Sequence, residues 1–224
     1  MQRQHFSLIG IYGGTFDPIH YGHLRIAEEL SDQLGLLRML FVPSGEPRLR
    51  AAPTASRMHR AAMVRLAVQG NDRFLLDERE VNRPGISTTV QTLQEYRSEF
   101  GYDTSLCCIV GMDAFIKIDQ WVEWRKLFTL CHLIVVPRPG YVSNDEQNIA
   151  APFKAELNGR RTANANELAC RSEGLIYFAA TSLLEISASR IRSLLASGRS
   201  VRYLLPDSVY AYITTNRLYN KNGI

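Results

Sequence analysis

Short runs of consecutive apolar residues alternate along this chain with longer segments in which apolar residues recur every three or four positions. The short runs are typical of buried strands, and the longer segments are typical of amphipathic helices. The runs predict strands at 8–12, 39–42, 74–76, 105–110, 133–136 and 176–178. The spaced segments predict helices at 24–37, 56–69, 88–100, 116–128, 189–197 and 207–215.

This alternation predicts an α/β fold, namely a Rossmann-like, doubly wound parallel sheet with helices on both faces. The 224 residues fit one domain spanning 1–224, with a small helical part at about 187–224. Residues 141–174 mix Asn, Ala and Glu with weak periodicity. We expect a surface lobe or a mobile segment there.

The composition, 46% hydrophobic and 21% charged, is that of an ordinary globular protein. The formal net charge of +4 is too small to indicate a nucleic acid or a membrane as partner. No apolar run approaches the ~18 residues of a membrane span, and the N-terminus lacks the pattern of a secretory signal, so we expect a cytoplasmic protein. The sequence leaves a homo-oligomer open.

The four cysteines form no C-x-x-C pair. Cys107 and Cys108 are adjacent within an apolar run, and Cys131 and Cys170 stand apart. We interpret them as buried, reduced thiols rather than as metal ligands or disulfides.

The loop after the first predicted strand carries candidate phosphate ligands. Gly13 and Gly14 have no Cβ, so their N–H groups and that of Thr15 can approach a phosphate closely. His20 and His23 are three residues apart, and on a helix their imidazoles would share a face and could donate to phosphate oxygens. Taken singly, a glycine pair is usually a turn and two such histidines have no joint role. A zinc pair would lack a third ligand nearby.

Asp17 and Pro18, between these groups, indicate a turn or a helix entry, with Asp17 as the cap. A second candidate phosphate site lies near the other end of the chain. Ser187 and Ser189 can cap a helix, and Arg192 would lie on the face of Ser189, where its guanidinium could clasp two phosphate oxygens. In isolation, this Ser-x-Ser pattern would more simply be a cap.

Loops 13–23, 111–113 and 181–192 all follow predicted strands and could converge on one crevice at the carboxyl ends of the sheet. The string GGTFDPIHYGH at 13–23 resembles the T/H-x-G-H family of nucleotidyltransferases. The string EISASRIR at 185–192 matches that family's I-S-x-[ST]-x-I-R element. The resemblance implies adenylyl transfer from ATP, with catalytic residues His20, His23 and Arg192 and ATP-binding residues Gly13, Gly14, Thr15, Phe16 and Ser189.

The middle of the chain bears on the acceptor. Asp113 could accept hydrogen bonds from ribose hydroxyls or cap a helix, and Trp121 could stack on a pyridine ring or fill the core. The strings IVGMD at 109–113 and PRPG at 137–140, with a W-x-x-W pair between them, resemble bacterial nicotinate-nucleotide adenylyltransferases. This resemblance covers nearly the whole chain, least at 141–174. It implies that the acceptor is bound by Thr88, Asp113, Trp121 and Arg138.

The chain departs from that pattern at two places. Where the family has P-P-H-K, this chain has PRLR at 47–50, so Leu49 replaces the histidine and Arg50 stands at the lysine position. We expect Arg50 to reach the ATP triphosphate, although arginine and lysine differ in geometry and its equivalence to the lysine stays open. The family's S-Y-T appears as STT at 87–89, which removes an aromatic neighbour of the acceptor ring.

The reaction implied by the resemblance is attack by the phosphate of nicotinate mononucleotide on the α-phosphorus of ATP. It gives nicotinate adenine dinucleotide and pyrophosphate, with Mg²⁺ on the triphosphate and no metal site built from protein ligands. No convincing Ser or Cys nucleophile is evident, so a covalent intermediate is not expected. Nicotinamide mononucleotide or another phosphate ester remains an alternative acceptor. Two other readings are a non-catalytic nucleotide sensor and an RNA-binding protein, since class I tRNA synthetases use a related H-x-G-H element.

Overall fold

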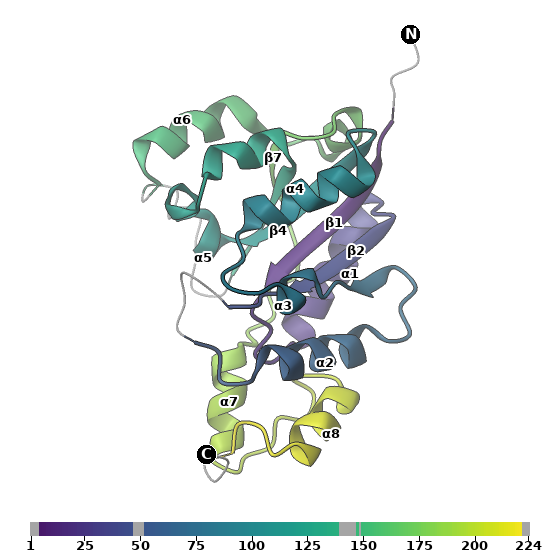
Figure 1. Ribbon diagram of the computed structural model, residues 1–224, viewed down its shortest axis with the longest axis vertical. Coiled ribbons are helices and arrows are strands. Elements are labelled where there is room, and N and C mark those ends of the chain that lie inside the picture. Colours follow the sequence, from purple (N-terminus) through teal and green to yellow (C-terminus); the bar gives the residue numbers. More distant parts are fainter. Residues whose placement is uncertain (1–4, 47–51, 139–146, 148, 221–224) are drawn as a thin grey trace. The chain divides into compact units, whose positions relative to one another are not determined.

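The computed structural model describes residues 5–46, 52–138, 147 and 149–220. The strands are β1 (Ser7–Gly14), β2 (Arg38–Pro43), β3 (Phe74–Leu76), β4 (Thr104–Gly111), β5 (His132–Val136), β6 (Arg161–Thr162) and β7 (Ile176–Phe178). They form a seven-stranded sheet in the order β3-β2-β1-β4-β5-β7-β6 (Figure 1). The pairs β1–β4, β4–β5, β5–β7 and β6–β7 are parallel, which confirms the predicted α/β class.

Most of the helices lie between strands along the chain, as expected for parallel pairing, and the last two follow the final strand. The helices are α1 (Tyr21–Leu34), α2 (Arg57–Val68), α3 (Arg79–Asn82), α4 (Thr89–Phe100), α5 (Met112–Phe115), α6 (Ala151–Arg160), α7 (Ala188–Ala196) and α8 (Asp207–Thr215). Short 3-10 helices are η1 (Ile118–Gln120), η2 (Trp124–Thr129) and η4 (Ala165–Cys170). Within the described part of the chain, no helix has the length and apolarity that crossing a membrane requires.

Side-chain caps explain why α2 and α4 begin close to where the sequence predicts. The Ser56 hydroxyl accepts a hydrogen bond from the backbone N–H of His59 at 3.3 Å. The Thr88 hydroxyl accepts one from the N–H of Gln91 at 3.2 Å. These bonds satisfy N–H groups that a helix start leaves without an intrahelical partner.

The single helix predicted at 116–128 is wrong. The structure instead has α5, η1 and η2 in this part of the chain, with η1 ending at Gln120 and η2 starting at Trp124. Glu123, just before η2, has a φ of +52°, a left-handed conformation that an α-helix cannot contain. Apolar spacing predicted burial correctly at Trp124, which is 8% exposed, but could not reveal this break in the backbone.

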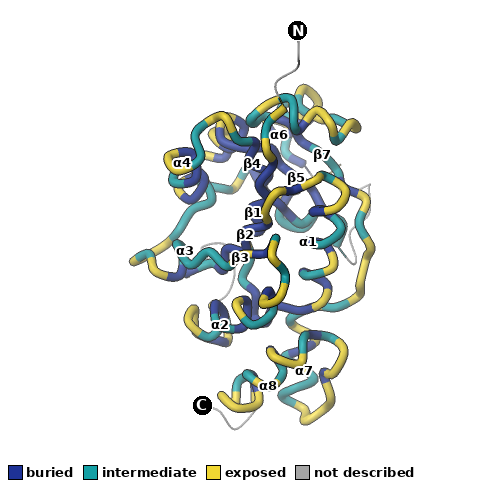
Figure 2. Tube along the Cα trace, turned by 90° about the vertical axis from the view of Figure 1, so that its right-hand side faces the viewer, coloured by how far each residue is buried: buried dark blue, intermediate teal, exposed yellow. Residues whose placement is uncertain are grey.

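The chain divides into two compact units, which we describe separately. Unit 1 comprises Met1–Tyr12, Glu29–Leu40 and Thr88–Leu183, and unit 2 comprises Gly13–Glu28, Phe41–Ser87 and Leu184–Ile224. In unit 1, the strands lie between α4 on one side and the second half of α1 on the other (Figure 2). The buried residues therefore run along the middle of the sheet.

The described part of 141–174 belongs to unit 1 and contains α6, β6 and η4. Phe153 of α6 is fully buried, and its ring lies 5.1 Å from that of Phe115 and 5.6 Å from that of Trp124, between centroids. Leu157 and Leu168 are buried as well. Residues from this part of the chain thus contribute to the core of unit 1.

Candidate functional site

The first predicted phosphate loop joins β1 to α1 within unit 2. Gly13 is exposed, whereas Gly14 and Thr15 are partly buried. Phe16 is only 2% exposed, and its ring packs against those of His23 and Phe41 at centroid distances of 5.1 and 6.0 Å. Of the ATP-binding residues predicted here, Phe16 can therefore offer a ligand its backbone rather than its side chain.

The two histidines of this loop lie side by side. Their ring centroids are 3.8 Å apart and the ring planes are inclined by 30°. His20 precedes α1, and its carbonyl accepts the N–H of His23 at 2.9 Å, which closes the first turn of the helix. The rings are 2% and 8% exposed. The spacing predicted neighbouring imidazoles, and the structure confirms this proximity.

Asp17 and Pro18 form a turn, which confirms one of the two predicted alternatives, but the Asp17 side chain does not cap α1. Its Oδ2 accepts the N–H of Thr54 at 2.8 Å, and its Oδ1 accepts the N–H of Ala55 at 3.1 Å. The hydroxyl of Tyr219 also donates to Oδ1, at 2.7 Å. The side chain points away from the helix because these three donors, all distant in sequence, surround a carboxylate that is 4% exposed. Asp17 therefore connects the loop to two other segments of unit 2.

Arg60 of α2, which sequence reasoning missed, also holds this loop. Its guanidinium donates to the carbonyl oxygens of Thr15 at 2.8 Å, Ser44 at 2.6 Å and Gly45 at 2.8 Å. The side chain is 1% exposed, and burial lowers the pKa of Arg60 while the Asp17 carboxylate opposes that effect. From the sequence, Arg60 could be recognised only as a residue of a predicted helix. Its hydrogen-bond partners are backbone carbonyl oxygens, which every residue has, so no sequence pattern identifies them.

The second predicted phosphate segment forms the start of α7 in unit 2. Ser187 is the N-cap, and its hydroxyl accepts the N–H of Arg190 at 3.3 Å. Ser189 lies in the first helical turn and is exposed, so of the two serines only Ser187 is used as a cap. Arg192 follows one turn later, and its side chain is 31% exposed.

The two phosphate segments meet inside unit 2 although about 170 residues separate them along the chain. Arg192 donates from Nη1 to the backbone carbonyl of Asp17 at 2.7 Å. The carbonyl oxygen of Ile186 lies 3.5 Å from the point where a Cβ on Gly22 would stand. Of the three loops predicted to converge, 13–23 and 181–192 are thus confirmed to meet, whereas the convergence of 111–113, which belongs to unit 1, with them stays a prediction.

Unit 1 holds a cluster of polar side chains at the carboxyl ends of β1, β4 and β5. Arg138 Nε lies 3.2 Å from Asp113 Oδ1, in an ion pair whose side chains are 30% and 25% exposed. A Cβ on Gly111 would stand 2.6 Å from Asp113 Oδ1 and 2.8 Å from Arg138 Nε, so the pair lies directly over this glycine. Beside it, burial raises the pKa of Tyr12 to about 12, which keeps the phenol protonated.

The other predicted acceptor residues also belong to unit 1. Trp121 lies between η1 and η2 and is partly buried, in contrast to the buried Trp124. The hydroxyl of Thr88 serves as the α4 cap, where it accepts the N–H of Gln91. Arg50 lies outside the described residues.

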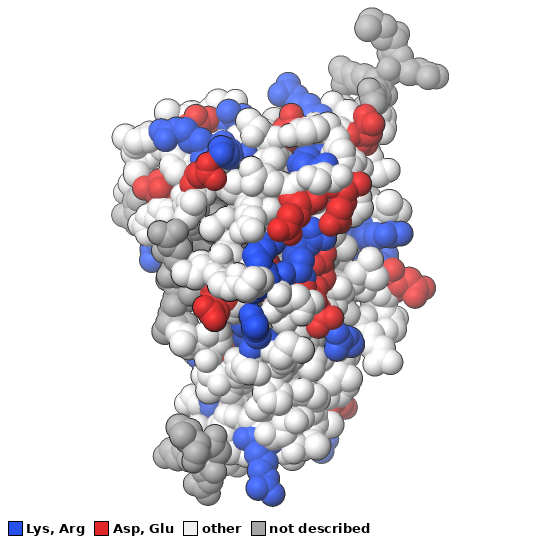
Figure 3. Space-filling view, in the orientation of Figure 1, with Lys and Arg blue, Asp and Glu red and all other residues white. Residues whose placement is uncertain are grey.

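On the face shown in Figure 3, Lys and Arg side chains are interspersed with Asp and Glu side chains, so this face carries no large patch of a single charge. Among the residues that the structure describes, no group of three or more His, Cys, Asp and Glu side chains could hold a metal ion.

The chain matches the cytidylyltransferase-like family over residues 11–194. A protein of Methylococcus capsulatus named "probable nicotinate-nucleotide adenylyltransferase" is 42% identical over 215 residues, 96% of this chain and 100% of the relative. A protein of the same name from Dechloromonas aromatica is 44% identical over 96% of this chain and 98% of its own length.

Among solved structures, one of the Plasmodium falciparum nicotinic acid mononucleotide adenylyltransferase complexed with NaAD has a similar fold. The TM-score is 0.70 at 17% identity, over 95% of this chain and 97% of that chain. This chain therefore shares its fold with an adenylyltransferase of known structure, in agreement with the predicted Rossmann-like fold.

Proposed function

The chain belongs to the nicotinate-nucleotide adenylyltransferases of the cytidylyltransferase-like family, and on this premise we propose that it transfers the adenylyl group of ATP to nicotinate mononucleotide. The products are nicotinate adenine dinucleotide and pyrophosphate, so the reaction is a step of NAD biosynthesis. The observation that carries the proposal is the hydrogen bond from Arg192 to the carbonyl of Asp17. It brings a guanidinium to the loop of the paired histidines.

The reaction in this proposal is a single displacement. A 5′-phosphate oxygen of the mononucleotide forms a bond to the α-phosphorus of ATP, and the bond from that phosphorus to the β-phosphate oxygen breaks. The attacking phosphate is an anion at neutral pH, so no strong general base is required. Catalysis consists of positioning the two substrates and stabilising negative charge in the transition state.

The ATP phosphates are the ligands that we assign to unit 2. Backbone N–H groups of Gly13, Gly14, Thr15 and Phe16 bind phosphate oxygens, as glycine-rich loops do elsewhere. His20 and His23 donate hydrogen bonds to the α-phosphate as pyrophosphate departs. Ser189 and Arg192 bind the β- and γ-phosphates, and Arg50 is proposed to contribute to the same group.

The acceptor is the ligand that we assign to unit 1. Asp113 accepts hydrogen bonds from a ribose, Trp121 stacks on the pyridine ring and Thr88 lies beside that ring. Nicotinate mononucleotide carries a carboxylate as well as a phosphate. The guanidinium of Arg138, paired with Asp113, offsets the charge that would otherwise repel such an acidic acceptor.

Mg²⁺ enters this proposal bound to the triphosphate of ATP, where it neutralises charge on the leaving group. The side chains of the site fit this arrangement, because they offer hydrogen-bond donors to phosphate rather than a set of carboxylates for a metal. His20, His23 and Arg192 would surround the magnesium-bound triphosphate without coordinating the ion.

The test is pyrophosphate release by the purified protein with ATP, measured with nicotinate mononucleotide and with nicotinamide mononucleotide. We expect a higher kcat/KM for the acid. A higher value for the amide would reassign the acceptor and leave the chemistry intact. Binding of ATP with no release of pyrophosphate in the presence of either mononucleotide would favour a nucleotide sensor and contradict the proposal.

A further inference from the structure

We infer that Tyr219, near the C-terminal end of the described chain, is a positioning residue for Arg192 and that it acts through the carboxylate of Asp17. By satisfying this carboxylate, Tyr219 keeps the guanidinium of Arg192 available for the phosphates of ATP. The inference rests on the proposed function, because it concerns how the ATP site of unit 2 is held.

The geometry supports two different relations between Arg192 and Asp17. Nη1 of Arg192 donates to the backbone carbonyl of Asp17 at 2.7 Å, which is a hydrogen bond. The same nitrogen is 3.7 Å from Oδ2 of the Asp17 carboxylate, which is too long for one. Arg192 is therefore anchored to the loop by a neutral group while the charged group beside it stays at a distance.

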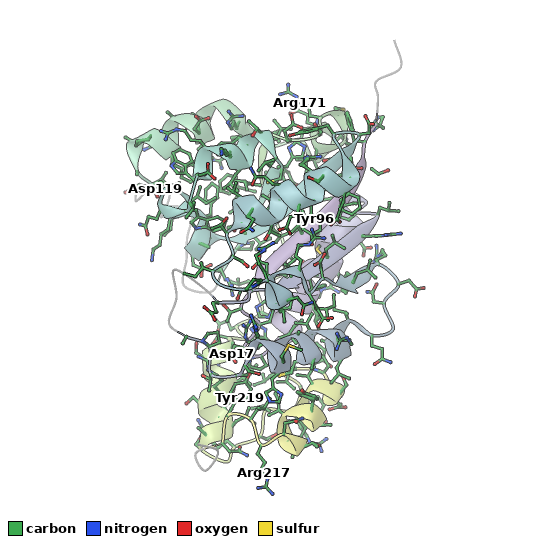
Figure 4. The ribbon with its side chains drawn as sticks, in the orientation of Figure 1. Asp17, Tyr96, Asp119, Arg171, Arg217 and Tyr219 are labelled. Carbon is green, nitrogen blue, oxygen red and sulfur yellow. The ribbon has the colours of Figure 1, made fainter. Side chains whose placement is uncertain are left out.

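The carboxylate can stay at that distance because other donors already satisfy it. The N–H of Thr54 donates a hydrogen bond to Oδ2, and the N–H of Ala55 and the hydroxyl of Tyr219 donate to Oδ1. The bond from Tyr219 is the shortest of the three at 2.7 Å. Figure 4 shows the two residues in the lower part of the molecule, with Asp17 above Tyr219.

Removal of one hydrogen-bond donor strengthens the attraction between the Asp17 carboxylate and nearby cations, because the carboxylate is buried. Asp17 is 4% exposed, so water cannot readily replace the lost hydrogen bond, and an unsatisfied buried carboxylate attracts a nearby cation more strongly. Two guanidinium groups interact with Asp17, and that of Arg60 is already held by three carbonyl oxygens, so the cation that can move closer is Arg192. A closer Asp17–Arg192 ion pair would compete with the phosphates of ATP for the same N–H donors.

Tyr219 is suited to this task. It is 9% exposed, and burial together with the neighbouring Asp17 raises the pKa of Tyr219 far above its ordinary value. The phenol therefore remains protonated and donates at every pH at which the protein would be assayed. No charge is added beside the phosphates, in contrast to what a lysine or arginine at this position would bring.

The experiment compares Tyr219→Phe with Tyr212→Phe. The first change removes the hydroxyl that donates a hydrogen bond to Asp17 and keeps the aromatic ring. The second removes a hydroxyl of α8 that lies 2.9 Å from Nδ1 of His59, a residue of α2. We expect Tyr219→Phe to raise the KM for ATP about fivefold, with kcat within about twofold of the wild type, since one hydrogen bond is worth about that much.

In the same experiment, the KM for the mononucleotide should stay unchanged in both variants, and Tyr212→Phe should leave the KM for ATP unchanged. In an Arg192→Lys background, Tyr219→Phe should have a smaller effect on the KM for ATP, because its action passes through the guanidinium. An unchanged KM for ATP in Tyr219→Phe, an equal effect in both backgrounds, or failure of Tyr219→Phe to fold would each overturn the inference. Pyrophosphate release by the wild type tests the proposed function separately.

Discussion

The imidazole rings of His20 and His23 lie with their centroids 3.8 Å apart and are only 2% and 8% exposed. Two imidazoles held this close could both donate to one phosphate group. Burial in unit 2 protects these donors from competition by water, so their interaction with a developing negative charge is stronger than it would be on an open surface.

We therefore predict that His23→Ala lowers kcat by about 10²–10³-fold, the usual effect of removing one preorganised donor to a transition state. Steady-state pyrophosphate release measures it. His59→Ala is the matched control, since His59 lies on α2 in the same unit and contacts Tyr212 rather than the phosphate loop. Near-normal turnover in His23→Ala, with the fold intact by circular dichroism, would exclude His23 from the mechanism.

A second prediction concerns Arg60. Lysine at this position cannot reach the carbonyls of Thr15, Ser44 and Gly45 together, so at least one buried acceptor loses its partner. We expect Arg60→Lys to lower the free energy of unfolding by about 2–3 kcal/mol and to raise the KM for ATP. Urea denaturation and ATP kinetics measure the two effects.

Arg65→Lys, on the same helix, is the control for Arg60→Lys. Arg65 is 59% exposed and pairs with Glu78 on the surface. Its replacement should change stability by less than about 0.5 kcal/mol. Equal effects of the two substitutions would show that the three buried hydrogen bonds of Arg60 do not hold the loop.

The periodicity of the chain predicted most of the strands and long helices because each needs only local information. The apolar runs of the strands and the apolar spacing of the helices lie within the elements that they define, and so do the observed caps at Ser56 and Thr88 and the glycine that ends α4, Gly101. The break at Glu123 was missed because a left-handed residue other than glycine has no reliable signature in the sequence.

The two proposed phosphate segments could be recognised because each is a local string of residues. Asp17, Arg60 and Tyr219 could not be assigned in the same way. Their partners are backbone groups, or a side chain about 200 residues away in sequence, so only the fold brings them together.

A third prediction tests the acceptor side. Gly111→Ala places a methyl group within 2.8 Å of both Asp113 Oδ1 and Arg138 Nε, so the ion pair must shift. We expect the KM for the mononucleotide to rise about tenfold while the KM for ATP stays unchanged, because a shifted polar contact typically costs about 1.4 kcal/mol. Initial-rate kinetics with each substrate varied in turn give the two constants.

Gly159→Ala provides the control for Gly111→Ala. A Cβ on Gly159 would meet nothing within 4 Å, and the residue lies in α6. Alanine there should leave both KM values unchanged and stabilise the helix by up to about 1 kcal/mol. If Gly111→Ala also left the KM for the mononucleotide unchanged, Asp113 and Arg138 would not bind the acceptor.

His132 of β5 gives a fourth prediction, on stability and pH. It is fully buried, and its Nδ1 accepts the N–H of Leu175 at 3.0 Å, so the proton sits on Nε2, which donates to the carbonyl of Arg171 at 3.1 Å. A second proton on Nδ1 would face the N–H of Leu175. Burial accordingly lowers the pKa of His132 from 6.5 to about 4.

Since the folded pKa of His132 lies below the unfolded one, the unfolded chain binds this proton first as the pH falls. The stabilisation of the folded protein by neutral His132 is therefore complete above pH 6.5 and declines between pH 6.5 and about 4. The loss of stability over that interval amounts to about 3 kcal/mol. We predict that the difference in unfolding free energy between wild type and His132→Gln shrinks by about this amount from pH 7 to pH 4. Urea denaturation at successive pH values measures it, and other titrating groups cancel in the difference. A difference that stays constant over this range would show that His132 is protonated as readily in the folded protein as in the unfolded chain.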